Sequence, residues 1–197
     1  MAPFPYVRPY LVPILLLAAA CRADLLWNEP SQGDLSNDRF NPTHFNLTLG
    51  DNQLIGFYAG DDGTGTGTFD RDYYSLTIPA GMQLAQINCE AYFSIDLFSF
   101  IAIQPGPTFP NDPTTVEPGD LLGWHHLNVS DVGNDILPAI GQNGQGFLPP
   151  LPAGTYSFWG QQMDDPTDYV LNFVVIPAPS PALLLLALFR PRRPFRP

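Results

Sequence analysis

Apolar and polar residues alternate along several short stretches of the chain. A period of two is the pattern of a β-strand that buries one of its faces. In the clearest stretch, Asp72–Ile78, the side chains of Tyr74, Leu76 and Ile78 share one face, and the residues between them share the other. Pro79-Ala80-Gly81 follows. It predicts the end of this strand, because Pro cannot donate to a sheet and Gly permits a turn.

Similar stretches predict a set of further strands, and Gly50-Asp51-Asn52 between the first two predicts that these two form a hairpin. No helical period of about ten residues occurs between Asp24 and Ile176. The pattern therefore predicts an all-β fold: an antiparallel, jelly-roll-like β-sandwich of about eight strands. The additional predicted strands are residues 45–49, 54–58, 84–93, 97–103, 121–124, 156–159 and 169–175.

The N-terminus has the pattern of a secretory signal peptide. Arg8 precedes an apolar stretch from Tyr10 to Ala20, and small residues predict cleavage between Ala23 and Asp24. An alternative is that Cys21 becomes a lipid-modified cysteine, since three alanines precede it as in a loose lipobox.

The cysteine count depends on that cleavage. If Cys21 leaves with the signal peptide, Cys89 has no partner, and no internal disulfide stabilises the fold. Cys89 falls in an alternating strand pattern, which predicts a buried thiol that acts as a small hydrophobic side chain.

The C-terminus combines a Pro-rich spacer, Ile176–Pro181, with the apolar stretch Ala182–Phe189. The stretch has eight residues and would form roughly 12 Å of helix, against roughly 30 Å of bilayer hydrocarbon. It predicts no stable transmembrane span in the mature protein. A basic cluster ends the chain, made of Arg190, Arg192, Arg193 and Arg196.

This arrangement resembles the bacterial PEP-CTERM sorting signal. The spacer matches its motif at Pro177, Pro179 and Ser180, while Ala178 stands where the family has Glu. The resemblance implies cleavage near the motif by a membrane protease of the exosortase type, and transfer to the cell surface. The alternative is a short apolar end with no sorting role. We therefore divide the chain into a signal peptide (1–23), a β-sandwich domain (24–176) and a sorting tail (177–197).

The predicted domain is strongly acidic. All nineteen Asp and Glu residues lie between Asp24 and Asp168, where Arg39 and Arg71 are the only basic side chains. Such a surface repels phosphates, so the charge excludes nucleic acid as a partner.

Part of the domain resembles the bacterial pre-peptidase C-terminal domain, a small secreted β-sandwich. The matching residues are Asp70-Arg71-Asp72-Tyr73, Pro79-Ala80-Gly81 and Gly154-Thr155-Tyr156. The resemblance covers roughly residues 51–175 and implies the same class of fold.

An acidic, Gly-rich loop is the candidate metal site. Asp61, Asp62, Asp70 and Asp72 offer carboxylates around a Gly/Thr run, and Ca²⁺ is bound by six to eight such oxygens. The alternative is a solvated turn with no metal. The sequence predicts no other cofactor.

Two further groups of residues are candidates for metal binding or ligand binding. His125 and His126 are adjacent on a predicted strand, so their rings face opposite sides and do not share a zinc ion. Trp124 is the candidate sugar-binding residue, while Trp159 and Tyr156 are expected to pack between the sheets. No motif for nucleophilic catalysis is present.

These observations favour an exported, non-enzymatic protein of the cell surface or extracellular matrix. Its role would be structural or adhesive, with exopolysaccharide, the export machinery and an exosortase-type protease as partners. The alternative is a carbohydrate-binding module, with calcium assisting. A third hypothesis, a secreted hydrolase, predicts a pocket in which carboxylates or His side chains converge.

Overall fold

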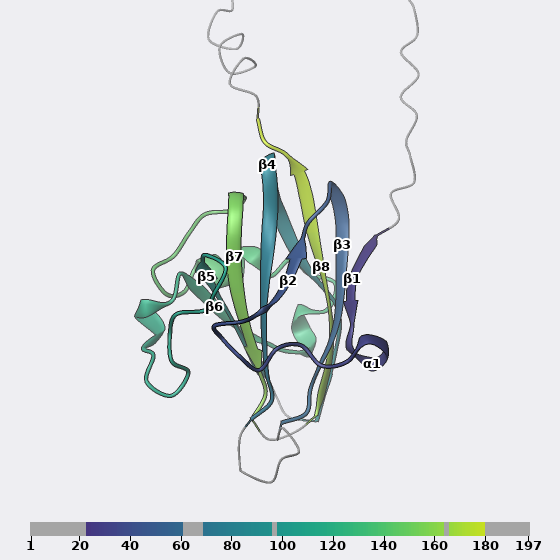
Figure 1. Ribbon diagram of the computed structural model, residues 1–197, viewed down its shortest axis with the longest axis vertical. Helices are drawn as coiled ribbons and strands as arrows, with labels where there is room; N and C mark the ends of the chain where they lie inside the picture. Colours follow the sequence, from purple (N-terminus) through teal and green to yellow (C-terminus); the bar gives the residue numbers. More distant parts are fainter. Residues whose placement is uncertain (1–22, 61–68, 96–97, 164–165, 180–197) are drawn as a thin grey trace, which may run out of the picture.

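The computed structural model describes residues 23–60, 69–95, 98–163 and 166–179. Within these ranges the protein is all-β and sandwich-like, as predicted, and its longest helix has five residues. None of these helices is long and apolar enough to cross a membrane. The elements are β1 (Asp24–Asn28), α1 (Glu29–Gln32), β2 (Thr43–Asn46), β3 (Gly50–Tyr58), β4 (Arg71–Ser94), β5 (Ser99–Pro105), η1 (Pro118–Asp120), β6 (Gly123–Leu127), η2 (Val129–Asp131), α2 (Leu137–Gly141), β7 (Leu151–Gln161) and β8 (Thr167–Pro177) (Figure 1).

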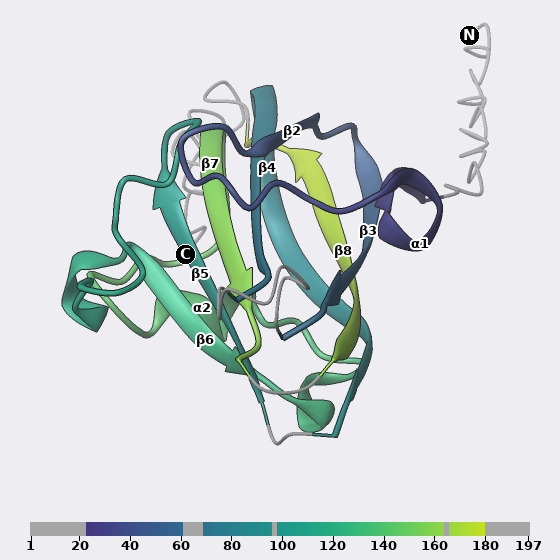
Figure 2. The ribbon, with the colours of Figure 1, turned by 60° about the horizontal axis from the view of Figure 1, so that its bottom comes forward.

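Strand β4 organises the fold because it is 24 residues long and changes partners along its length. Its first part, from Arg71 to Ile78, pairs with β7 on one side and with β2 on the other. From Met82 onward it pairs with β8. One layer is therefore β2-β4-β7-β5-β6 and the other is β4-β8-β3-β1, with β4 running through both (Figures 1 and 2).

The change of partner occurs at Pro79-Ala80-Gly81, where the sequence predicted the end of a strand. That prediction is wrong, because β4 continues through these residues. The register with β7 shifts between Ile78 and Gln83, and Gly81 adopts a φ of 78°. An irregularity of this kind bends a strand without ending it, since the residues on both sides of it stay paired.

The predicted hairpin also does not form. Residue Phe45 of β2 pairs with Leu76 of β4, whereas Leu54 of β3 pairs with Leu171 of β8. The β2–β4 and β1–β3 pairings are parallel, and the others are antiparallel. Alternation shows which side chains share a face, but it does not identify the neighbouring strand.

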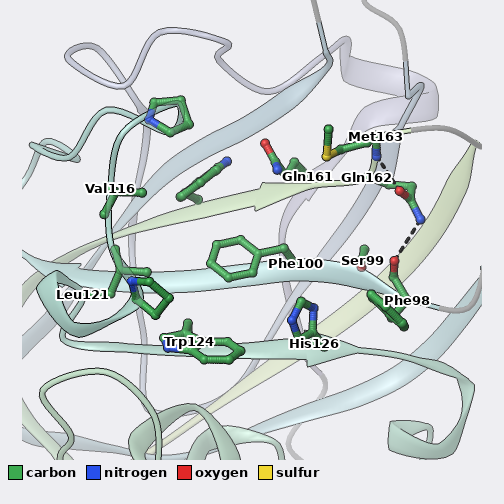
Figure 3. A pocket seen from close by; sticks show the side chains of 13 residues that line it. Phe98, Ser99, Phe100, Val116, Leu121, Trp124, His126, Gln161, Gln162 and Met163 are labelled. Carbon is green, nitrogen blue, oxygen red and sulfur yellow. Dashed lines mark hydrogen bonds between the residues drawn. The ribbon is translucent and has the colours of Figure 1, made fainter.

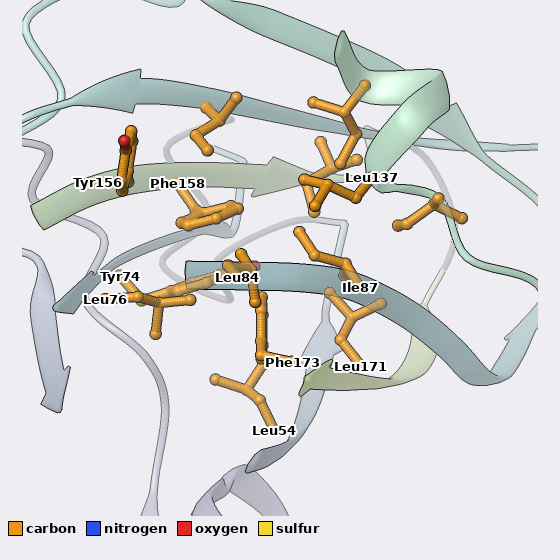
Figure 4. Close-up of a cluster of buried hydrophobic side chains, with 14 of the residues drawn as sticks. Leu54, Tyr74, Leu76, Leu84, Ile87, Leu137, Tyr156, Phe158, Leu171 and Phe173 are labelled. Carbon is orange, nitrogen blue, oxygen red and sulfur yellow. The ribbon is translucent and has the colours of Figure 1, made fainter. Parts of the chain in front are cut away.

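The main core lies between the two layers. Phe173 of β8 packs edge-to-face against Tyr74 of β4 and Phe158 of β7, with ring centroids 6.3 and 5.8 Å apart. Figure 4 shows these rings with the surrounding Leu and Ile side chains. Cys89 is fully buried in the same cluster, as predicted, and burial raises the pKa of its thiol to about 11.

A second, smaller cluster lies on the outer face of the first layer. It contains Trp159, which the sequence placed between the sheets. Trp159 is buried as expected, but in this outer cluster rather than between the layers, whereas Tyr156 packs in the main core. Phe158 points into the core, and its neighbour Trp159 must therefore point outward. The remaining buried members of this outer cluster are Tyr73, Ala102, Phe109 and Leu121.

The two ends of the described chain lie at the same end of the second layer. Asp24 of β1 is the partner of Asn52, which is in turn the partner of Phe173 near the end of β8. Beyond β8, the backbone N–H of Ala178 donates to the carbonyl of Gly81 at 2.8 Å. Residues 1–22 and 180–197 lie outside the described part of the chain, and Ser180 of the motif is among them. The three-part division of the chain therefore stays a prediction.

Candidate functional site

A groove opens on the outer face of the first layer, over β5, β6 and β7. Its volume is about 490 Å³. The strands form its floor, and the segment between β5 and β6 forms one wall (Figure 3). Trp124, the predicted sugar-binding residue, lies on this floor.

Strand register places four rings side by side on the floor. Trp124 and Trp159 are both partners of Ala102 across β5, so they flank the middle strand. Phe100 lies between them, with centroid distances of 6.0 Å to Trp124 and 4.8 Å to Trp159. His126 meets Trp124 edge-on at 5.3 Å. The result is a continuous aromatic surface, which we call the aromatic floor: Phe100, Trp124, His126 and Trp159.

The wall is held in place by polar contacts to β5 and to the segment before β2. Gln104 of β5 donates from Nε2 to Asn111 Oδ1 at 2.6 Å and to the carbonyl of Asp120 at 2.8 Å. Arg39 donates to the carbonyl of Pro110 and forms an ion pair with Asp112 at 3.7 Å. These contacts hold an otherwise irregular, Pro-rich segment in place. Its groove-lining residues are Pro113, Val116, Pro118 and Leu121.

Polar groups occur along the rim of the groove. Gln161 accepts a hydrogen bond from Arg71 Nε at 3.0 Å through Oε1, which leaves its amide nitrogen to act as a donor. Burial, and then the charge of neighbouring His125, lower the pKa of His126, so its ring is neutral near pH 7. A neutral imidazole both donates and accepts hydrogen bonds.

A flat aromatic surface with amide and imidazole groups at its edge suits a saccharide. The C–H face of a sugar ring packs on aromatic rings, and its hydroxyls need donors and acceptors at the margin. Among the described residues, the groove lining contains no Asp or Glu. The carboxylate pair used by most glycoside hydrolases is therefore missing from this lining.

Two of the four candidate calcium ligands lie within the described residues. Asp61 and Asp62 lie outside the described residues. Both remaining carboxyls are buried: Asp70 immediately precedes β4, and Asp72 is its second residue. Asp70 Oδ2 accepts a hydrogen bond from the backbone N–H of Ala59 at 2.7 Å, and Asp72 Oδ2 accepts one from the hydroxyl of Tyr169.

The fold brings two further acids to Asp72 that the sequence analysis did not single out. Oxygens of Glu29, Asp34 and Asp72 lie within 4.8 Å of one another. A cavity of about 270 Å³ adjoins them, lined in part by Glu29, Asp34 and Asp70. We call this cluster of four carboxylates the acidic pocket. Glu29 and Asp34 lie some forty residues before Asp70 and Asp72, so spacing could not bring the two pairs together, although an isolated Glu before Pro30 was a local hint.

Glu29 is held rigidly in the acidic pocket. Its carboxylate accepts hydrogen bonds from the backbone N–H of Leu35, at 2.6 Å, and of Phe57. Burial raises the pKa of Glu29 to about 8, although these two N–H groups act to lower it. Burial, and then the charge of Glu29, also raise the pKa of Asp72. In the absence of a compensating cation, these acids therefore resist ionisation.

The two adjacent histidines face opposite sides of β6, as the sequence predicted. His125 Nε2 lies 3.1 Å from Asp131 Oδ2, whereas His126 contacts Trp124.

No protein-family model matches the chain, and no curated protein matches it either. The function is therefore argued from the geometry of these sites.

Proposed function

We propose that this protein is an exported carbohydrate-binding domain that attaches to extracellular polysaccharide through the aromatic floor. One observation carries the proposal: Phe100, Trp124 and His126 form an open row of rings in a groove with amide groups at its rim. An adhesive role at the cell surface or in the matrix follows, with the leader and the PEP-CTERM-like tail as the route to that location.

The geometry favours a non-catalytic role for this groove. Stacked rings recognise the face of a sugar without changing it, and the wall lining is Pro, Val and Leu rather than acid or base. The sorting motif Pro177-Ala178-Pro179-Ser180 and the cleavage site at Ala23 and Asp24 belong to the same proposal, since an exopolysaccharide is met outside the cell.

Binding of the purified protein to a glycan array, followed by calorimetry with the best ligand, tests the proposal. Replacing Trp124 by Ala removes one stacking surface, and we expect roughly tenfold weaker binding, about 1.4 kcal/mol. Phe93→Ala is the matched control, because Phe93 is an exposed ring (68% accessible) outside the groove lining. Equal affinity of the Trp124→Ala variant and the unaltered protein would refute the assignment of the groove.

A further inference from the structure

The acidic pocket joins parts of the chain that are far apart in sequence. Glu29 belongs to α1 and Asp34 follows that helix, whereas Asp70 immediately precedes β4 and Asp72 is its second residue. Figure 1 shows α1 beside the lower end of the strands, away from the end of β8. The pocket shares no lining residue with the aromatic groove, so a ligand bound there is independent of the proposed function.

This concentration of negative charge has little visible compensation. The charged groups with the largest effect on the Asp72 carboxyl are Glu29, Asp70 and Asp34, all of them acids. In the part of the chain that the structure describes, neither ion pair involves Glu29, Asp34 or Asp72. Carboxylates this close need a shared proton or a bound cation.

The Asp72 side chain supplies a second observation that points to a bound cation. Its side chain is completely buried, and its Oδ1 atom has no hydrogen-bond partner, while Oδ2 is bonded to Tyr169. An unpaired buried carboxylate oxygen is costly, and native proteins rarely leave one without a function. This carboxyl lies beside those of Glu29 and Asp34.

We propose that the acidic pocket binds a calcium ion, with Glu29, Asp34 and Asp72 as ligands and Asp70 in the wall. Two oxygens that bind one Ca²⁺ at 2.3–2.6 Å can be at most about 5 Å apart, and the observed limit of 4.8 Å satisfies this condition. The donors are all oxygens, which favours a hard cation over zinc or copper. The adjoining cavity of about 270 Å³ has room for the water ligands that complete the coordination.

The calcium ion has a structural role. Its ligands would connect the segment after β1 to β4, and Glu29 already holds the N–H of Phe57 in β3. An ion that binds the folded state alone raises the free energy of unfolding as its concentration rises. Three carboxylates favour Ca²⁺, which accepts irregular coordination, over Mg²⁺, which requires a near-ideal octahedron and retains its waters.

Terbium luminescence and thermal unfolding of the full chain test the inference. Tb³⁺ replaces Ca²⁺ and is excited through nearby tyrosines, of which Tyr169 is bonded to Asp72. After treatment with EDTA, we expect Tb³⁺ emission that added Ca²⁺ displaces, and a rise in Tm of about 5–10 °C at a hundredfold excess of Ca²⁺ over its Kd. Mg²⁺ at the same concentration should give a much smaller rise.

Variants can distinguish a pocket that binds a metal ion from one whose carboxyls are simply protonated. Asp34 is exposed, so Asp34→Asn leaves the fold intact while removing a ligand, and it should weaken Ca²⁺ binding at least tenfold. Asp72→Asn should abolish the Ca²⁺-dependent rise in Tm. Glu90→Gln, an exposed acid on β4 outside the pocket, is the control and should behave like the unaltered protein. An unchanged Tm with Ca²⁺, or an equal rise in all variants, would overturn the proposal.

Discussion

Tyr169 of β8 donates its hydroxyl hydrogen to the carboxyl of Asp72 in the first half of β4, and this bond crosses from one layer of the sandwich to the other. Both side chains are completely buried. The ring of Tyr58 stacks on that of Tyr169 with centroids 4.6 Å apart. A polar contact at this depth is sensitive to small changes, because a lost partner leaves a buried group unpaired.

The first prediction concerns this hydrogen bond. Tyr169→Phe removes the only hydrogen-bond donor to Asp72 recorded among the described residues, and we expect the free energy of unfolding to fall by about 1–3 kcal/mol in EDTA. Tyr74→Phe is the matched control, since Tyr74 is equally buried but its hydroxyl has no partner. That variant should be neutral or slightly more stable. Urea unfolding measures both, and equal losses would contradict the role given to the Tyr169 hydroxyl.

The second prediction concerns the glycine that makes room for the stacked tyrosines. A Cβ atom on Gly160 of β7 would lie 2.1 Å from the hydroxyl oxygen of Tyr58, so Tyr58 would have to move. We expect Gly160→Ala to lower the free energy of unfolding by about 1–3 kcal/mol, the usual cost of overpacking. Gly119→Ala has nothing within 4 Å of its new Cβ and should change stability little. Denaturant midpoints for the two variants give the comparison.

The period-two pattern predicted the fold class because burial acts on each strand separately. Tyr74, Leu76 and Ile78 were assigned to one face, and all three are buried in the main core. The pattern could not predict which strands are neighbours, because strand pairing depends on residues far apart in the sequence. It could not show that β2 lies beside β4, or that β4 bends at Gly81 and continues.

The candidate sites also contain some residues that local sequence could reveal and others that it could not. Trp124 was found from the sequence because an aromatic residue among polar neighbours is visible locally. The rest of the aromatic floor required the register of β5, β6 and β7. Asp70 and Asp72 were identified, but Glu29 reaches Asp72 only through the packing of α1 against β3.

A third prediction uses the buried thiol. Burial raises the pKa of Cys89 from 9.0 to about 11, so the folded state keeps this proton at a pH where the unfolded chain has lost it. The contribution to stability is therefore complete below pH 9 and is lost as the pH rises toward 11, at up to about 1.4 kcal/mol per pH unit. Urea unfolding at pH 8, 9 and 10 should show a steeper fall for the unaltered protein than for Cys89→Ala. Parallel curves for the two proteins would contradict the prediction.

The burial of Cys89 also predicts that its thiol reacts slowly with alkylating reagents. The thiolate is the reactive form of cysteine, and Cys89 is both fully covered and protonated at neutral pH. In a Cys21→Ser background, we expect alkylation of Cys89 by iodoacetamide at pH 8 to be at least a hundredfold slower than in urea. Rapid labelling of the folded protein would show that the second half of β4 opens readily.

The final prediction concerns processing. β1 begins at Asp24, where we expect the signal peptide to be removed, and its pairing with β3 starts at that residue. At the other end, β8 ends at Pro177, and Ala178 is still bonded to Gly81. Cleavage after Ala23 and near the motif would therefore remove no strand pairing. Intact-mass spectrometry of protein secreted by its native host should give a chain that begins at Asp24 and ends near residues 177–180. A secreted chain that keeps its four C-terminal arginines would contradict the sorting proposal. A lipid-sized mass increase on a chain that begins at Cys21 would instead establish the lipoprotein alternative.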